Sequence, residues 1–392
     1  MSTTQLQEEG YCQGYRPLVA SNITYHFTTE LRAVPDDTIV GSSDETICTD
    51  HMITAEWTKA NGWSSPELKP YGPLSLLPTS SCLHYAFQCF EGMKAYRGYD
   101  GQLRLFRPDR NASRFQMSTE RISLPTAEPD ELLKLIHVLI SIDGPKWLPK
   151  SRPGSFMYLR PTMIGTQPQL GVSTPKKAML YIVMSFMGRL DNIPGGMRLE
   201  TSPDDMVRAW TGGFGDAKVG ANYGPSAKAL NATQGRGFHQ VLWLYGPKGN
   251  CTEAGGSNFF VVWKRLDGEN ELITAPLDDK IILDGVTRRS CLDLARLRLG
   301  DDLIVTERRF NIQELIEAND QGRLLEVFSC GTAYGIGPIS QIVHGGHEIN
   351  IPTGALRGGG RITNQIRDWL VEIMYGTVEH EWGVVVTERG EE

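Results

Sequence analysis

The stretch Thr211–Ser226 reads TGGFGDAKVGANYGPS and places five glycines around one lysine, Lys218. Glycine adopts positive φ and lets the backbone approach a ligand closely, so such a segment is typical of a sharp turn or of a chain that wraps a bound molecule. The stretch contains neither G-x-x-x-x-G-K-[ST] nor a G-x-G-x-x-G that opens a helix after a strand, which excludes both nucleotide fingerprints. A lysine presented in this way is a candidate for Schiff-base chemistry, provided that its amine is kept neutral. The plainer alternative is a glycine-rich turn whose lysine lies in solvent.

Length and composition are those of an ordinary folded protein. The 392 residues, 40% hydrophobic and 22% charged, allow two domains or one large one. A net charge of −7 argues against nucleic-acid binding through a general basic field. Seven cysteines without a C-x-x-C predict neither a zinc site nor a disulfide framework, and the eight histidines show no metal-binding spacing, so no metal is expected.

The N-terminus, MSTTQLQEEGYCQGYR, lacks an apolar core and an Arg-rich amphipathic helix. It therefore predicts neither a signal peptide nor a transit peptide. The sequence contains no run of about 18 apolar residues, so no membrane span is expected. These features favour a cytoplasmic location over a mitochondrial one.

The apolar patterning predicts an α+β protein, because both halves mix strands and helices, mostly through hairpins rather than by strict βαβ alternation. We expect strands at 103–106, 156–165, 177–186, 241–246, 258–264 and 271–276, and helices from 108, over 128–142, from 225 to 233, over 287–300, near 312–319 and over 362–376. The helix over 128–142 has an apolar stripe made of Leu132, Leu135, Ile136 and Leu139. The predicted organisation is an N-terminal arm (1–47), a small α/β domain (48–186), an interdomain linker (187–198) and a large domain (199–392), whose tail after the last helix carries no clear signal.

Residues downstream of Lys218 strengthen its chemical interpretation. Glu253 follows it by 35 positions, directly after a predicted hairpin turn, and LDGVTR at 283–288 is predicted to open a helix. A helix N-terminus is a ready site for phosphate. A lysine, a carboxylate and an anion site are together what pyridoxal 5'-phosphate (PLP) requires, since the lysine forms the imine, the carboxylate keeps the ring nitrogen protonated and the N–H groups hold the phosphate.

Several ordered blocks resemble one family. EAGGSNFF, LIT and LDGVTR resemble the signature of class-IV, fold-type IV PLP-dependent aminotransferases, whose fold is that of D-amino acid aminotransferase. TDHMITAEW, LHYAFQCFEGMKAYRG, LRLFRPDRNASR, YLRPTMIGTQPQLGV, GGFGDAKVGANYGPS and QVLWLYGP resemble the branched-chain amino acid aminotransferases of eukaryotes. The blocks are collinear from about Thr49 to the final helix, and so cover nearly the whole chain.

The resemblance implies a role for each matching residue. Lys218 would be the Schiff-base lysine and proton shuttle, Tyr223 would bond the phenolic oxygen of PLP, and Glu253 its ring nitrogen. The implied cofactor-binding residues are Arg114, Lys218, Tyr223, Glu253, Gly256, Leu283, Val286, Thr287 and Thr332, and the implied substrate-binding residues are Tyr85, Tyr158, Arg160, Leu170, Val172 and Ala333. Leu170 and Val172 would reach in from a partner subunit, so a homodimer is expected. Taken singly, Arg160 could be a structural ion-pair partner, the two pocket tyrosines core aromatics, and Glu253 a surface acid.

The implied activity is transamination of leucine, isoleucine and valine with 2-oxoglutarate, by a ping-pong mechanism, as in branched-chain amino acid biosynthesis. The products would be branched-chain 2-oxo acids and glutamate. An apolar pocket would take the aliphatic side chain, and Arg160 with Tyr158 would bind the distal carboxylate of glutamate. Alternatives within the fold are a transaminase for D-amino acids, (R)-amines or unusual aliphatic or aromatic amino acids, and an aminodeoxychorismate lyase. An alternative from another class is a catalytically silent scaffold.

Three departures from the family pattern concern the side-chain pocket. Tyr334 and Gly337 stand where mammalian relatives have a redox C-x-x-C, so no thiol regulation is expected there. The stretch GSSDETIC before TDHM lacks the family's aromatic residue, and GRL at 188–190 replaces a tyrosine of the interdomain loop. The reaction type is therefore better defined by the sequence than the substrate side chain.

Overall fold

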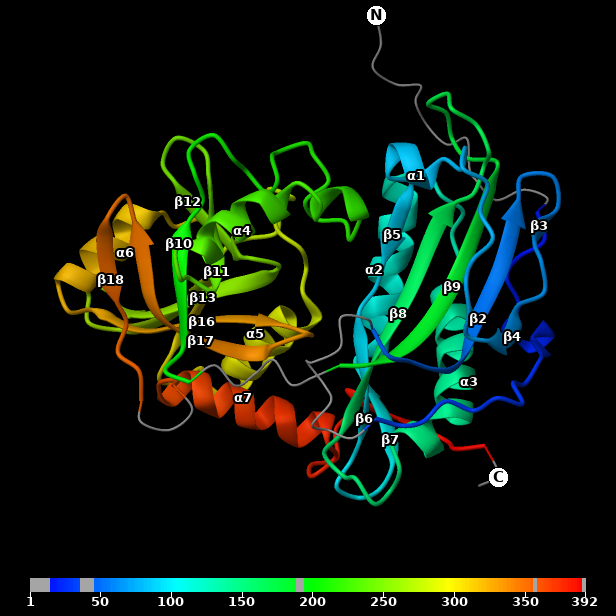
Figure 1. Ribbon diagram of the computed structural model, residues 1–392. Coiled ribbons are helices and arrows are strands. Elements are labelled where there is room, and N and C mark those ends of the chain that lie inside the picture. The colour runs from blue at the N-terminus through cyan, green and yellow to red at the C-terminus, as the bar shows by residue number, and fades with distance from the viewer. Residues whose placement is uncertain (1–14, 36–45, 188–193, 355–357, 390–392) are drawn as a thin grey trace, which may run out of the picture.

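Two β-sheets organise the chain, and the computed structural model shows them lying side by side, each with its own helices (Figure 1). The structure describes residues 15–35, 46–187, 194–354 and 358–389. Each half of the structure combines one sheet with helices, which is the α+β organisation expected from the sequence. None of the helices formed by the described residues could span a lipid bilayer.

The first sheet is built mainly from antiparallel hairpins. Its strand order within the described residues is β1-β4-β2-β9-β8-β6-β7-β19, with β3 paired to β2 and β5 to β8. The strands are β1 (Thr24–Tyr25), β2 (Cys48–Thr58), β3 (Gly62–Trp63), β4 (Glu67–Pro70), β5 (Gln88–Phe90), β6 (Met93–Arg97), β7 (Leu103–Phe106), β8 (Phe156–Gly165), β9 (Lys177–Phe186) and β19 (Gly383–Val386). The strands predicted at 103–106, 156–165 and 177–186 are confirmed.

Helices α2 (Pro108–Arg121) and α3 (Pro129–Trp147) pack with this sheet, and the short α1 (Cys82–Tyr85) precedes β5. The predicted stripe of α3 is confirmed, because all four of its side chains are fully buried in the core of the first sheet. Burying one such side chain stabilises the fold by about 1.5–3 kcal/mol. The stripe therefore fixes which face of α3 meets the sheet.

The end predicted for α3, at residue 142, is wrong: the helix continues to Trp147 with Pro145 inside it. Proline has no N–H to donate to the carbonyl four residues earlier, which normally ends a helix. Here that carbonyl, on Ser141, accepts instead from the backbone N–H of Arg389 (3.1 Å). The last turn is also held by Trp147, whose Nε1 donates to Asp50 Oδ2 (2.8 Å) in the buried core.

The second sheet has the strand order β12-β11-β10-β17-β16-β13-β14-β15, with β18 paired to β17. Its strands are β10 (Met197–Thr201), β11 (Gln240–Tyr245), β12 (Asn250–Ala254), β13 (Ser257–Lys264), β14 (Asn270–Thr274), β15 (Ile304–Glu307), β16 (Leu324–Gly331), β17 (Gly335–His344) and β18 (His347–Asn350). Its helices are α4 (Ser226–Gly235), α5 (Val286–Leu299), α6 (Ile312–Asp320) and α7 (Arg361–Met374). The four helices predicted in this half are confirmed within one to two residues at most ends.

Strand β13 shows why this sheet is covered on both faces. Successive side chains of a strand point to opposite faces. Phe260 belongs to the apolar cluster that includes α5 and α7, whereas Phe259 belongs to the cluster that includes α6. The near-continuous apolar run of β13 therefore marks a strand buried on both sides.

The two ends of the chain join the first sheet. Strand β1, in the predicted arm, pairs in parallel with β4, and β19 pairs antiparallel with β7. The tail after the last helix, which carries no clear signal in the sequence, forms an edge strand with its VVV run, and Glu388 pairs with the buried Arg97. The division into domains remains a prediction. Strand β19 departs from it, because this strand belongs to the predicted large domain but pairs with the first sheet. Most of the predicted linker, including 188–190, lies outside the described residues.

Candidate active site

Lys218 lies where the two sheets and their helices meet. Its backbone N–H donates to Ser118 Oγ on α2 (2.9 Å), and its carbonyl accepts from the N–H of Phe90 at the end of β5 (3.1 Å). The close approach of the glycine-rich stretch to β5 requires Gly220, since a Cβ at this position would lie 2.4 Å from Gln88 Nε2. The glycine-rich stretch therefore carries its lysine on a loop that is fixed against the first sheet.

The amine of Lys218 faces two aromatic rings. Its Nζ donates to Tyr223 Oη (3.0 Å), and it lies 4.8 Å from the centre of the Phe90 ring. The guanidinium of Arg160 lies 4.6 Å from the same ring, and the Phe90 and Tyr223 rings are 5.1 Å apart. Phe90 thus joins a residue predicted for the cofactor to one predicted for the substrate. The sequence interpretation gave Phe90 no separate role, although it stands inside the aromatic-rich block at 83–96.

Glu253 is a buried acid with one saturated and one open oxygen. Its Oε1 accepts from the Leu283 N–H (3.1 Å) and from Asn258 Nδ2 (3.1 Å). Its Oε2 lies 2.6 Å from Arg208 Nε, yet it has no hydrogen-bond partner among the described residues, because the ion pair lacks hydrogen-bond geometry. Burial raises the pKa of Glu253, and the charge of Arg208 opposes that rise. Arg208 had no role in the sequence interpretation, because nothing in the local pattern links it to position 253.

Arg114 on α2 is held by a second buried acid, Glu91. Its Nε and Nη2 donate to the two carboxylate oxygens of Glu91 (2.7 and 2.8 Å), and its Nη1 donates to the carbonyl of Asp284 (2.9 Å). Asn111 Nδ2 also donates to Glu91 (2.8 Å). Burial raises the pKa of Glu91, but the adjacent Arg114 more than offsets this and leaves it below its usual value. The three bonds leave two N–H groups of the guanidinium for another acceptor, and they direct Arg114 toward the segment that leads into α5.

The predicted phosphate-binding residues gather at the N-terminus of α5. Gly285 is the N-cap of this helix and no side chain caps it, so its first N–H groups have no intrahelical partner. A small cavity of about 20 Å³ lies at this end. The residues that line it are Met93, Lys94, Tyr96, Phe106, Asn111, Val286, Thr287, Thr332 and Met374. Lys94 Nζ also donates to the carbonyl of Ala333 (3.1 Å), which fixes the loop that carries Thr332.

The predicted substrate-binding residues fall into two groups. Arg160 Nη2 lies 3.5 Å from Tyr158 Oη on β8, and its buried Nε has no hydrogen-bond partner among the described residues. Tyr85 donates instead to the carbonyl of Leu170. Leu170 and Val172 are 60% and 77% exposed. The structure therefore places Arg160 and Tyr158 beside Phe90. Tyr85 and Leu170, which are joined by a hydrogen bond, form a second group that is exposed and lies apart from the first.

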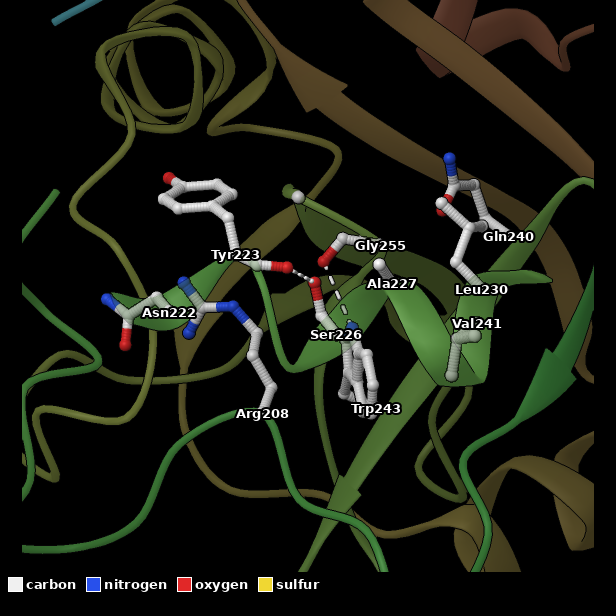
Figure 2. Close-up of a pocket in the computed structure, with 11 residues that line it drawn as sticks. Arg208, Asn222, Tyr223, Ser226, Ala227, Leu230, Gln240, Val241, Trp243 and Gly255 are labelled. Carbon is white, nitrogen blue, oxygen red and sulfur yellow. Dashed lines mark hydrogen bonds between the residues drawn. The ribbon is translucent and has the colours of Figure 1, made fainter. Parts of the chain in front are cut away.

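A cavity of about 270 Å³ lies beside Tyr223, between α4 and β11 (Figure 2). Figure 2 shows Arg208 and Tyr223 on one side of it and Leu230, Gln240 and Val241 on the other. Gly256, at the turn between β12 and β13, also lines this cavity. Gly256 and Tyr223, both predicted to bind the cofactor, therefore line the same cavity.

Neither a disulfide nor a cluster of potential metal ligands is present in the part of the chain that the structure describes. The six cysteines placed there are free thiols. No group of three or more His, Cys, Asp or Glu side chains among the described residues could hold a metal ion. What the site does assemble is an amine, three arginines, two buried acids and an uncapped helix N-terminus, an arrangement suited to a ligand with an anionic end and a basic ring nitrogen.

Comparison with known proteins gives a consistent result. The family model for amino-transferase class IV matches residues 88–342. The chain is 46% identical over 344 residues to a cytosolic branched-chain-amino-acid aminotransferase of Saccharomyces cerevisiae, which covers 87% of this chain and 90% of the relative. It is 43% identical over 352 residues to a cytosolic one of Mus musculus, covering 89% and 88%, and 40% identical over 380 residues to a mitochondrial one of Schizosaccharomyces pombe, covering 96% and 88%.

Solved structures share the fold. A branched-chain aminotransferase of Thermoproteus uzoniensis, with norvaline, superposes with a TM-score of 0.66 at 24% identity and covers 87% of this chain and 100% of its own. A branched-chain amino acid aminotransferase of Thermobaculum terrenum in its PLP form gives a TM-score of 0.64 at 23% identity, covering 85% and 98%.

Proposed function

The chain belongs to the class IV aminotransferases, among the branched-chain-amino-acid aminotransferases, and from this premise we propose that it exchanges the amino group between leucine, isoleucine or valine and 2-oxoglutarate. The observation that carries the proposal is the contact between Lys218 Nζ and Tyr223 Oη, in a site that also holds the buried acid Glu253. The alternative of a catalytically silent scaffold is disfavoured, because a half-buried amine and phenol beside a fully buried acid are costly to keep together without a use.

Class IV aminotransferases use PLP, and the residues present fit this group. The open Oε2 of Glu253 suits a ring N–H donor, and the uncapped N-terminus of α5 suits a phosphate. We propose that the holding residues are those predicted from the sequence: Arg114, Lys218, Tyr223, Glu253, Gly256, Leu283, Val286, Thr287 and Thr332. Bound there, PLP supplies an aldehyde carbon for amino exchange and a protonated ring that withdraws electrons.

The chain's own groups would perform the proton and binding steps. Lys218 Nζ takes and returns the substrate proton, and Tyr223 Oη keeps the amine oriented. The free Nε of Arg160, next to Tyr158, suits the distal carboxylate of glutamate. Phe90 lies near both cations and offers an apolar surface to an aliphatic side chain. One pocket can therefore accept both substrates in turn, as a ping-pong mechanism demands.

We propose a homodimer as the functional unit. Leu170 and Val172 are apolar, exposed and carried on the loop between β8 and β9, which supports a role across a subunit interface. Leu170→Glu should shift the sedimentation coefficient toward that of a monomer and lower turnover. A dimer that keeps its size and activity in this variant would remove Leu170 from the interface.

Substrate preference and location belong to the proposal as well. Tyr334 follows Ala333 in the loop between β16 and β17, and this bulky neighbour favours, as a second candidate, a preference for an unusual aliphatic or aromatic amino acid. A screen of L-, D- and non-proteinogenic amino acids distinguishes this preference from one for leucine, isoleucine and valine.

Relatives are described as cytosolic and as mitochondrial. We propose that this protein acts in the cytosol, and cell fractionation tests this location.

The direct test of the proposed site uses the colour of the purified protein. Wild-type protein should show the visible absorbance of lysine-bound PLP, and Lys218→Ala should lose both the band and the transaminase activity. Lys228→Ala, on α4, is the matched control and should keep both. A colourless wild-type protein that takes up no PLP would refute the enzyme assignment.

A further inference from the structure

Arg208 is a buried cation in the segment between β10 and the glycine-rich stretch. Its side chain is 7% exposed, and that of Glu253, its ion-pair partner, is 2% exposed. The 2.6 Å contact between Arg208 Nε and Glu253 Oε2 supplies charge but leaves the acceptor position of Oε2 open. Arg208 thus acts on the same oxygen that is free to receive another donor.

The guanidinium is held in place by backbone carbonyls. Nη1 donates to the carbonyl of Ile281 (3.0 Å), and Nη2 to that of Gly215 in the glycine-rich stretch (3.4 Å). A Cβ at Gly215 would lie 2.4 Å from Ala209 Cβ and 3.0 Å from Ile281 O, so this convergence of three segments needs a glycine. A planar fork of N–H donors suits two carbonyl acceptors at fixed directions, with a carboxylate beside them, better than a lysine ammonium does.

The charge of Arg208 opposes the protonation of its partner. A buried carboxylate without a cation takes up a proton. Burial raises the pKa of Glu253, and among the groups that lower it Arg208 is the largest, with Lys218 and Arg288 contributing from further elements. Because a guanidinium stays charged throughout the physiological pH range, it favours the ionised acid.

We propose that Arg208 is a positioning residue for the cofactor site: it keeps Glu253 ionised and oriented so that the open oxygen binds the protonated ring nitrogen of PLP. This inference rests on the proposed function, since it requires PLP as the ligand. The proposed role also explains why the segments around residues 208, 215 and 281 pack closely together, since the carbonyls at 215 and 281 hold the Arg208 guanidinium. The glycine-rich stretch then has two tasks: it carries Lys218, and its Gly215 carbonyl holds Arg208, the cation that pairs with Glu253.

The test compares PLP with 1-deaza-PLP, in which a carbon replaces the ring nitrogen. Both are titrated into the apoprotein of the wild type, of Arg208→Met and of the control Arg236→Met, which removes an arginine from an exposed ion pair with Glu200. The wild type should prefer PLP by about ten- to hundredfold, the factor expected for a charged hydrogen bond. Arg208→Met should lose most of that preference, and Arg236→Met should keep it.

A merely structural role for Arg208 gives a different result. Both ligands would then weaken by the same factor and the preference for PLP would survive in Arg208→Met, which would overturn the assignment. If Arg208→Met does not fold, Arg208→Gln carries the same comparison, and Arg208→Lys, which keeps the charge, should restore most of the preference. A wild-type protein that takes up neither ligand would refute the proposed function instead, so the two failures are distinguishable.

Discussion

The buried pair of Glu91 and Arg114 should be the most sensitive polar contact of the site. Glu91 is fully buried and accepts from the Nε and Nη2 of Arg114, from Asn111 Nδ2 and from the Gly92 N–H. Replacing it by leucine leaves a guanidinium that is 8% exposed without its counter-ion. Breaking a buried ion pair in this way costs about 3–5 kcal/mol. For a folding unit of roughly 150–250 residues, that corresponds to a fall in melting temperature of about 6–20 °C.

The assay is thermal and urea unfolding of the apoprotein for Glu91→Leu, Arg114→Met and the double variant. The double variant should lose much less than the sum of the two single losses, because it leaves no uncompensated charge. Arg265→Met, which removes one partner of an exposed pair with Asp267, is the control and should show no resolved change. Additive losses in the double variant, or an unchanged Glu91→Leu, would refute the reasoning.

Three further outcomes are expected. Gly215→Ala should destabilise the protein by about 1–3 kcal/mol, because its Cβ would meet Ala209 Cβ at 2.4 Å, whereas Gly224→Ala, with open space around it, should be neutral; equal melting temperatures would contradict this. Arg160→Ala should slow the glutamate half-reaction more than the leucine one in stopped-flow traces, and equal losses would exclude the dual-substrate role. Burial raises the pKa of Glu91, but its paired guanidinium lowers it, and the net pKa lies below the ordinary value of about 4.3. The ionised Glu91 therefore stabilises the fold above that pH, and this stabilisation should disappear as the pH falls through the folded-state pKa. Urea midpoints of Glu91→Gln should therefore fall less steeply in acid than those of the wild type, and parallel curves would contradict this.

Local patterns in the sequence predicted the parts of the fold whose determinants are local. The stripe of α3 has a helical period that reports the buried face directly, and the apolar runs of β8 and β9 mark strands that are buried along most of their length. The end of α3 was missed, since the acceptor left by Pro145 is satisfied by the N–H of Arg389, more than two hundred residues away. Strand β19 was missed for the same reason, because an edge strand is defined by its partner.

The candidate site divides in the same way. Lys218, Glu253 and the N-terminus of α5 could be predicted as site candidates because glycines, turns and helix starts leave local signals. The role of Arg208 could not be read from the sequence, since its contact with Glu253 joins positions on different segments and follows no spacing rule. Phe90 had a weak signal, its place in an aromatic-rich block, but only the folded chain shows two cations within 5 Å of its ring centre, at 4.6 and 4.8 Å.

The most direct measurement of the central claim is a single-turnover absorbance experiment on the PLP-loaded protein. Addition of L-leucine alone should abolish the visible band at one equivalent per chain, with 4-methyl-2-oxopentanoate released, and 2-oxoglutarate should restore the band with release of glutamate. A band that leucine, isoleucine and valine all leave unchanged, in a protein that has bound PLP, would contradict the assignment of a branched-chain amino group transfer to this site.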